Sequence, residues 1–495
     1  MASIAPPLPR APSPSAAAPL SWSAALLIVA AAVAQQASIG LDCDVSWLLT
    51  VAEKWLAGAR LYRDVQEVNP PASMLLYLPG VALAQAAGLR AEAVTVALTM
   101  ALAMASAGWS ARLALRAGLL TRENATRLAP VAAFVLLLLP AGCFAQREHF
   151  VVLASLPALV ALAALADRRA IGASACLAAG CGAGLAICVK PHFALAFTLP
   201  ALLAWRGGGG SRELAAGAAG ATAVVLAYFL LVATCFSDFF SLLPTIAATY
   251  LPVREEPARL LVGPVVALPL ALGALALSVA RRPATPVGVL LLSGAGFAAA
   301  GLIQAKGYLN HAYPAAALGF PALAIALLDP DASRDRRRIG AACALLLALA
   351  DWRAYSGISN RPELVAAVER IAPPRPRVIA LSTELGLGHP LTRLLGGEWV
   401  GRRAALFVAG GAEGLMANAG PAKRVALSAY AREDARMFAA DVARERPDLV
   451  LADGTLGPDW LRRHPEATRA MAAYRPALRV GEVTVWAPRA GARAR

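Results

Sequence analysis

Charged residues are scarce in this chain of 495 residues, and their scarcity excludes an ordinary soluble protein. They form 16% of the sequence, whereas apolar residues form 58% and the mean hydropathy is +0.59. Soluble globular domains carry about 25% charged residues. Runs of roughly 20 apolar residues, the length that crosses a bilayer core, recur from Leu20 to about Asp351. The sequence therefore predicts a polytopic α-helical membrane protein.

The cysteines follow no regular spacing, which excludes a disulfide framework and a zinc site. Six of the seven lie in or beside apolar runs, and only Cys43 lies in the first loop. Small side chains in apolar runs are common where membrane helices pack closely. We expect no metal ion and no cofactor.

Aromatic residues are also few, at 6%, and this affects how the net charge of +15 is interpreted. A nucleic-acid-binding surface needs a clustered basic patch, whereas the arginines of the membrane part fall in short turns between apolar runs. The positive-inside rule places such turns in the cytoplasm. No nucleic-acid partner is expected.

The arginine-rich turns also orient the predicted spans. If the first apolar run is directed outward and residues 70–89 lie along the outer surface, nearly every such turn falls on the cytoplasmic side. The first run could instead be a cleaved signal peptide, with Ala32 and Ala34 at the cleavage site. A long, proline-rich leader and the spans that follow favour a retained helix. This interpretation gives about eleven transmembrane helices, at 20–37, 91–113, 128–144, 150–166, 171–189, a short run ending at 205, 214–235, 260–280, 285–303, 314–328 and 339–350.

Composition divides the chain into three parts. Residues 1–19 are rich in proline, alanine and serine and predict a disordered tail. Residues 20–352 form the transmembrane domain, whose first periplasmic loop, 40–90, carries surface helices. Residues 353–495 contain charged residues throughout and predict a small periplasmic α/β domain, on the same side as the first loop. Its extended stretches are 377–381, 449–453 and 480–487, and a helical stretch is 431–446.

In this topology the unusual polar residues gather on the outer side. Ionisable groups at membrane depth cost about 2.5–3.5 kcal/mol each on insertion scales, so such a gathering indicates a functional site. A structural role is open for each residue as well. Asp42 or Asp44 can cap the helix that begins near Val45, while Arg147 and Glu148 can form an interfacial ion pair. The gathered residues are Asp42, Asp44 and Glu67 in the first loop, Arg147, Glu148 and His149 in the second, and Lys190, His192, Lys306, Asn310 and His311 in later turns.

The first loop carries a pattern of acidic, small and turn-forming residues. Asp-x-x-x-Leu-x-x-x-Ala spans 44–52 and is followed by Gly58-x-x-x-Tyr62-x-Asp64 and by Asn69-Pro70-Pro71. This pattern resembles the first periplasmic loop of the GT-C glycosyltransferases. The resemblance is to the protein mannosyltransferase-like branch, which includes the aminoarabinose transferases and the rhizobial galacturonosyltransferases. It implies a GT-C-like fold and transfer of a sugar from a polyprenyl-phosphate donor.

The resemblance also implies roles for single residues. A catalytic aspartate is expected in the first loop, and Asp44 matches it best, eight residues before Ala52. Many relatives have glutamate where this chain has Val45, so the match can also be placed at Asp42. Glu148 meets the acidic position of the second loop, and a lysine-proline pair at 190–191 after a glycine-rich helix is a further shared feature.

The chemistry of such a transfer fits the residues that are present. A base must take the acceptor proton, and cations must hold the departing phosphate. Arginine binds phosphate through a two-pronged fork and lysine as a point charge. Asp44, with Asp42 as the alternative, is predicted as the base, beside Glu148. The predicted donor phosphate-binding residues are Arg147, Lys190, His192, Lys306 and His311, and Glu67, Tyr62 and Asn69 are assigned to acceptor or loop positioning.

These observations favour a multi-pass glycosyltransferase of the bacterial inner membrane, with its active site on the outer face. Its expected partners are a polyprenyl-phosphate sugar, membrane lipid and a lipid, glycan or protein acceptor. A transporter or flippase for a lipid-linked saccharide is the alternative. It should show broken helices at matching positions of two related halves, and the sequence shows no such halves. A structural membrane protein would leave the polar residues scattered.

Overall fold

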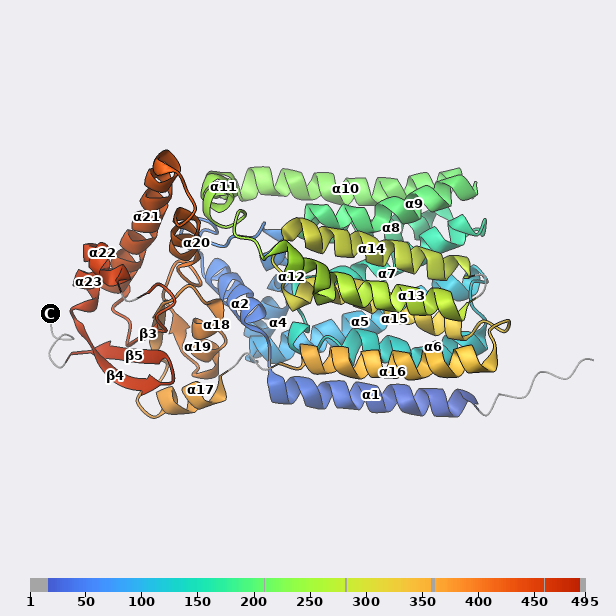
Figure 1. The fold of residues 1–495 in the computed structure, drawn as a ribbon, viewed down its shortest axis with the longest axis horizontal. Coiled ribbons are helices and arrows are strands. Elements are labelled where there is room, and N and C mark those ends of the chain that lie inside the picture. Colours follow the sequence, from blue (N-terminus) through green and yellow to red (C-terminus); the bar gives the residue numbers. More distant parts are fainter. Residues whose placement is uncertain (1–16, 209, 281–282, 358–360, 458, 490–495) are drawn as a thin grey trace, which may run out of the picture.

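The computed structural model describes residues 17–208, 210–280, 283–357, 361–457 and 459–489. A bundle of long, roughly parallel helices makes up most of the molecule, and a smaller α/β domain covers one end of the bundle (Figure 1). We call this end the domain end and the other the opposite end. The bundle helices are α1 (Ala17–Ile39), α5 (Ala91–Arg116), α6 (Arg122–Ala133) with η1 (Phe134–Leu138), α7 (Arg147–Ala166), α8 (Ala173–Val189), α9 (Leu195–Gly207), α10 (Ser211–Cys235), α12 (Pro257–Val262), α13 (Pro264–Val279), α14 (Thr285–Gln304), α15 (Leu309–Leu327) and α16 (Arg334–Tyr355).

Membrane-spanning character is evident in the lengths and composition of these helices. Within the described ranges, six are long and apolar enough to cross a bilayer. The prediction of a polytopic membrane protein is therefore confirmed, whereas the count of eleven spans stays a prediction. One boundary needs correction: residues 17–19, assigned to the tail, already belong to α1. The rest of the predicted tail lies outside the described residues. The six helices are 19–39, 91–116, 147–166, 211–235, 257–279 and 285–304.

Several basic turns meet at the opposite end of the bundle. The Arg169 guanidinium donates to the carbonyl of Gly118 at 2.6 Å, and Arg168 donates to the carbonyl of Gly207 at 2.6 Å. The turns after α5, α7 and α9 thus share one end of the bundle, away from the α/β domain (Figure 1). This is the grouping that a charge-oriented helical bundle requires.

The first loop lies at the domain end, and its helices are short. It contains α2 (Cys43–Leu56), α3 (Ala72–Leu75) and α4 (Leu78–Ala87), all shorter than a bilayer crossing requires. Residues 45–52 of α2 are buried without interruption, because the helix lies between the bundle and the α/β domain. That residues 70–89 lie along the outer surface stays a prediction.

A five-stranded mixed sheet forms the centre of the α/β domain. Its order is β2-β1-β3-β5-β4, in which β1 pairs in parallel with β2 and β3, and β5 pairs antiparallel with β3 and β4. The first extended stretch predicted from the sequence coincides with β1. Helix α21 begins ten residues before its predicted start. The strands are β1 (Arg377–Leu381), β2 (Glu398–Trp399), β3 (Leu449–Ala452), β4 (Tyr474–Val480) and β5 (Val483–Pro488), and the helices are α17 (Pro362–Glu369), α18 (Leu385–Gly388), α19 (Leu391–Leu394), α20 (Phe407–Met416), α21 (Pro421–Glu445), α22 (Trp460–Arg463) and α23 (Pro465–Met471).

Glycines allow α8 and α10 to pack backbone against backbone. A Cβ atom at Gly180 of α8 would lie 2.0 Å from the carbonyl oxygen of Gly217, and one at Gly220 of α10 would lie 2.2 Å from that of Leu177. No side chain fits at such distances. Small residues of this kind are the usual means of close approach between membrane helices, where no hydrophobic driving force operates.

Gly180→Ala should therefore destabilise the protein. In an open helix the change favours folding by up to about 1 kcal/mol, but overpacking at a close contact costs about 1–3 kcal/mol. Gly288→Ala is the matched control, because no atom lies within 4 Å of its would-be Cβ. We expect a lower thermal midpoint in detergent for the first variant and an unchanged or higher one for the second. Equal midpoints would contradict the seam between α8 and α10.

Candidate active site

Two aspartates lie at the start of helix α2, and they make different contacts. Asp42 is the N-cap, with φ −62° and ψ 162°, and its Oδ1 accepts the backbone N–H of Asp44 at 2.9 Å. This is the ordinary use of an aspartate before a helix. Asp44 lies in the first turn, with its side chain 34% exposed, and forms an ion pair with Arg147 at 3.6 Å. Of the two residues that the sequence left open, Asp42 caps the helix and Asp44 faces the ion pair.

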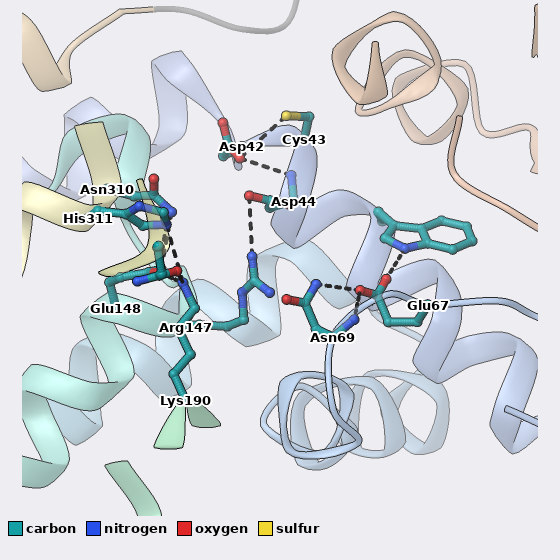
Figure 2. Close-up of polar contacts among 12 residues, drawn as sticks. Asp42, Cys43, Asp44, Glu67, Asn69, Arg147, Glu148, Lys190, Asn310 and His311 are labelled. Carbon is teal, nitrogen blue, oxygen red and sulfur yellow. Dashed lines mark hydrogen bonds and ion pairs between the residues drawn. The ribbon is translucent and has the colours of Figure 1, made fainter. Parts of the chain in front are cut away.

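The residues after Gln146 begin helix α7 and direct two opposite charges to different neighbours. Arg147 extends toward Asp44 of α2, whereas Glu148 points toward α8 and α15 (Figure 2). The Glu148 carboxylate is completely buried. It accepts from Lys190 Nζ at 2.5 Å and from Asn310 Nδ2 at 3.2 Å. A buried carboxylate needs such partners, since an unpaired charge in the interior is very costly.

Lys190 connects Glu148 to the end of α14 and the start of α15. Its ammonium donates to Gln304 Oε1 at 2.8 Å and lies 3.3 Å from His311 Nε2. His311 Nε2 is in turn 3.8 Å from Glu148 Oε1. Four elements therefore bring their polar residues together at the domain end. We call Asp44, Arg147, Glu148, Lys190 and His311 the charged cluster.

Glu67 and Asn69 hold the shape of the first loop. Glu67 accepts from the indole N–H of Trp47, and its Oε1 accepts from the Asn69 backbone N–H at 2.8 Å and from Asn69 Nδ2. The hydroxyl of Tyr62 donates to the Asn69 carbonyl at 2.7 Å. Burial raises the pKa of Glu67. The contacts of Glu67, Tyr62 and Asn69 favour loop positioning over acceptor binding.

The remaining predicted residues are placed differently. His149 packs inside the bundle, where Nδ1 accepts from the Ala145 N–H at 3.1 Å and Nε2 lies 2.9 Å from the Leu136 carbonyl. His192 is partly buried near Lys190, and burial followed by the lysine charge lowers its pKa to about 4.

Lys306 contacts a loop rather than the charged cluster. It donates to the carbonyls of Tyr250 and Val253 at 2.7 and 2.6 Å, and its ammonium lies 4.2 Å from the centre of the Tyr250 ring. Burial, with a further contribution from Arg254, lowers the pKa of Lys306 to about 8. These contacts satisfy much of its hydrogen-bonding capacity.

Several buried polar atoms of the site have no hydrogen-bond partner within the described part of the chain. They are Nη1 of Arg147, Nδ1 of His311, Nε2 of His192 and Oε1 of Gln146. Buried polar groups are nearly always paired, so a bound ligand or ordered water would complete these four atoms, as it would other such atoms elsewhere in the bundle and the α/β domain. Three of the four atoms belong to side chains that suit an anion. Among the described residues, no group of three or more His, Cys, Asp or Glu side chains could hold a metal ion.

Sequence reasoning missed two contributors to the site. Gln304 Oε1 accepts a hydrogen bond from the Lys190 ammonium, and the indole N–H of Trp47 donates one to Glu67. Gln304 is the last residue of an apolar helix, at the edge of a predicted outer turn, and this position was a usable signal. The role of Trp47 depends on how the first loop folds back on α2, which no local pattern indicates.

The raised pKa of Asp42 predicts that the stability of the protein depends on pH. Burial and the charge of Asp44 raise the pKa of Asp42 to about 6. Between pH ~4, near the ordinary aspartate value, and pH ~6, the folded state then binds more protons than the unfolded state, so the free energy of unfolding falls as pH rises. Asp42→Asn keeps the cap, but its side chain does not titrate. As pH rises across this interval, the thermal midpoint of Asp42→Asn should therefore increase relative to that of the parent.

Asp64→Asn is the matched control. A hydrogen bond from the Arg60 backbone lowers the pKa of the exposed Asp64 carboxylate. The parent is then favoured at neutral pH, and its advantage should shrink as pH falls through the ordinary aspartate range. A midpoint difference for Asp42→Asn that does not change with pH would contradict the buried, like-charged environment of Asp42.

Comparisons with known proteins add little. No protein-family model and no curated protein matches the chain. Among solved structures, it is similar to the archaeal oligosaccharyltransferase AglB from Archaeoglobus fulgidus, in complex with an inhibitory peptide and a dolichol-phosphate. The identity is 13%, the match covers 92% of this chain and 72% of that chain, and the TM-score is 0.44. A likeness at this level does not indicate a function.

Proposed function

We propose that this protein is a GT-C-type membrane glycosyltransferase, which moves a sugar from a polyprenyl-phosphate donor to a lipid, glycan or protein acceptor. The observation that supports this most is the pairing of Asp44 with Arg147. Asp44 is the carboxylate of the charged cluster that is open to an incoming molecule, whereas Arg147 is buried with its side chain only 7% exposed. One residue can accept a proton from an acceptor, and the other can hold an anion beside it.

Arg147 provides the anion site. Its Nη2 contacts Asp44 at 3.6 Å, while its buried Nη1 has no partner in the described ranges. Leaving a buried donor unpaired costs about 1–3 kcal/mol. A phosphate oxygen at Nη1 would remove this cost, and arginine binds phosphate more specifically than other cations. The free nitrogens of His311 and His192 are further donors or acceptors on the side of Lys190.

Asp44 provides the base. In the proposed step, an acceptor hydroxyl attacks the anomeric carbon of the sugar, and the bond from that carbon to the phosphate oxygen breaks. The proton of the hydroxyl passes to Asp44, and the electron pair leaves with the polyprenyl phosphate, held by Arg147. A cation ~4 Å from the leaving phosphate contributes ~4 kcal/mol at an effective dielectric near 20, which is about a thousandfold in rate. Inversion at the anomeric carbon is the expected outcome.

The buried pair of Glu148 and Lys190 is proposed to support the site. Glu148 is occupied by Lys190 and Asn310, so it is not available as a base. Glu148 follows Arg147 in the first turn of α7, so its carboxylate is a fixed negative charge close to the Arg147 guanidinium. We leave Asp42 out of the proton transfer because it caps α2, and Lys306 out of the phosphate set because it holds the carbonyls of Tyr250 and Val253.

The setting of the reaction is part of the proposal. The charged cluster lies around the start of α2, at the domain end of the bundle, and the turns after α5, α7 and α9 lie at the opposite end (Figure 1). With those turns in the cytoplasm, the cluster and the α/β domain lie on the outer side of a bacterial inner membrane. The bundle would then cross this membrane about eleven times. A lipid-linked donor then reaches the site from the outer leaflet.

Asp44→Asn should abolish most sugar transfer. Removal of a general base lowers rates by about 10²–10⁴-fold, whereas Asp42→Asn, which keeps the helix cap, should stay within about tenfold of the parent. Asp64→Asn tests the loss of a carboxylate elsewhere in the same loop. Transfer would be followed in membranes with a panel of polyprenyl-phosphate hexoses and pentoses labelled in the sugar. Full activity of Asp44→Asn would remove the proposed base.

Arg147→Gln should abolish stabilisation by a polyprenyl monophosphate. A ligand at 100 times its Kd stabilises a protein by about 2.7 kcal/mol, which raises the thermal midpoint of the parent measurably. Undecaprenyl phosphate is the probe, and the uncharged polyprenol is its control. Arg127→Gln, at an exposed arginine that pairs with Glu123, should respond like the parent. Equal stabilisation of Arg147→Gln and the parent would contradict the anion site.

A further inference from the structure

One arginine of the α/β domain connects that domain with two elements of the membrane part. Arg393 of α19 donates from Nη1 and Nη2 to the two carboxylate oxygens of Glu53 in α2, at 2.6 and 2.8 Å. Its Nε donates to Glu92 at the start of α5, at 2.8 Å, and Nη1 also lies 3.3 Å from Thr50 Oγ1. The side chain is only 11% exposed. A two-pronged, partly buried pair of this kind fixes direction as well as distance.

The arginine acts on the helix that carries the proposed base. Asp44 and Glu53 are nine residues apart, so they lie about 13 Å apart along α2 and on nearly opposite faces of it. Arg147 of α7 contacts α2 at the first position, and Arg393 contacts it at the second. Two attachments on opposite faces and at opposite ends restrain both the tilt and the rotation of a short helix.

The α/β domain makes further contacts with α2. Lys54 donates to the carbonyl of Gly401 at 3.4 Å. The ring of Trp47 lies 5.3 Å from that of His389, which is itself 4.6 Å from Trp399 of β2. The domain therefore meets α2 at its middle and at its C-terminal end, but the polar contact with the shortest distances is that of Arg393.

We propose that Arg393 is a positioning residue for Asp44, so that the α/β domain sets the geometry of the reaction. This inference rests on the proposed function of Asp44. Helix α2 has a radius of about 5–6 Å including side chains, so a rotation of about 10° moves the Asp44 carboxylate by about 1 Å. Misplacement by 1 Å can lower a rate by about a hundredfold. Loss of Arg393 should therefore reduce the rate of transfer while the donor phosphate still binds at Arg147.

The first measurement follows the position of α2 without using activity. Cys43 adjoins Asp44 and is partly buried, whereas Cys235 at the end of α10 is exposed. Alkylation of each cysteine by a maleimide would be timed by peptide mass spectrometry on the full chain in detergent. Arg393→Gln and Glu53→Gln should accelerate labelling of Cys43 at least fivefold with no change at Cys235. Glu92→Gln, which leaves the pair with Glu53 intact, should have a smaller effect.

Arg377→Gln is the matched control, because the polar contacts of Arg377 in the described part of the chain are with Glu445, Glu398 and Asp448 of the α/β domain itself. It should lower the stability of that domain and leave Cys43 labelling unchanged. Unchanged labelling of Cys43 in both Arg393→Gln and Glu53→Gln would overturn the inference. So would equal acceleration in Arg377→Gln, since the effect would then be general loosening.

The second measurement separates positioning from binding. In the transfer assay, kcat should fall by about 10–100-fold for Arg393→Gln, with little change in KM for the donor, and Arg393→Lys should recover part of the loss. Stabilisation by undecaprenyl phosphate should match that of the parent. A rise in KM with kcat unchanged would overturn a positioning role. If Cys43 responds as expected but the parent shows no transfer dependent on Asp44, the proposed function fails while the attachment of α2 by Arg393 stands.

Discussion

The ion pair between Asp44 and Arg147 joins the short helix α2, enclosed between the bundle and the α/β domain, to the long apolar helix α7, and the organisation of the site depends on it. Arg147 is almost completely buried, so its charge requires a nearby carboxylate. Asp44 meets this need from the first turn of α2, at 3.6 Å. The pair is long for a hydrogen-bonded salt bridge and leaves one guanidinium nitrogen unpartnered among the described residues. In the proposed function, an anionic ligand completes this pair at that nitrogen.

Around this pair, charges of opposite sign lie next to one another. Glu148 adjoins Arg147 in sequence but points to the other side of α7, where Lys190 balances it. Lys190 is held by Gln304 and lies beside His311, at the ends of two further helices. The alternation of sign keeps buried charges compensated across several elements. In the proposed reaction, Arg147 would hold the departing phosphate and Asp44 would take the acceptor proton.

Part of this arrangement is visible in the sequence. Apolar runs of bilayer length alternate the side on which each turn falls, so residues 147–148, 190 and 311 can be assigned to one end of the bundle without a structure. The first extended stretch of the last domain coincides with β1, because a short β-branched and apolar run between charged segments is distinctive. These features depend on local composition and on the thickness of a membrane.

Other features depend on contacts between distant segments, and the sequence does not reveal them. That Asp42 rather than Asp44 caps α2 depends on the extended backbone of Asp42, which turns its carboxylate toward the helix start. Lys306 is directed to the carbonyls of Tyr250 and Val253 because the loop before α12 folds over it. The pair between Arg393 and Glu53 joins residues 340 positions apart. Strand β2, with two residues, is too short to show a period.

The most direct test of this account is a structure of the protein in lipid with bound undecaprenyl phosphate. We predict that the phosphate lies within hydrogen-bonding distance of Nη1 of Arg147, with the Asp44 carboxylate beside it and open to the solvent side. A phosphate bound elsewhere, with the pair between Asp44 and Arg147 unchanged and its free nitrogen occupied only by water, would contradict the account.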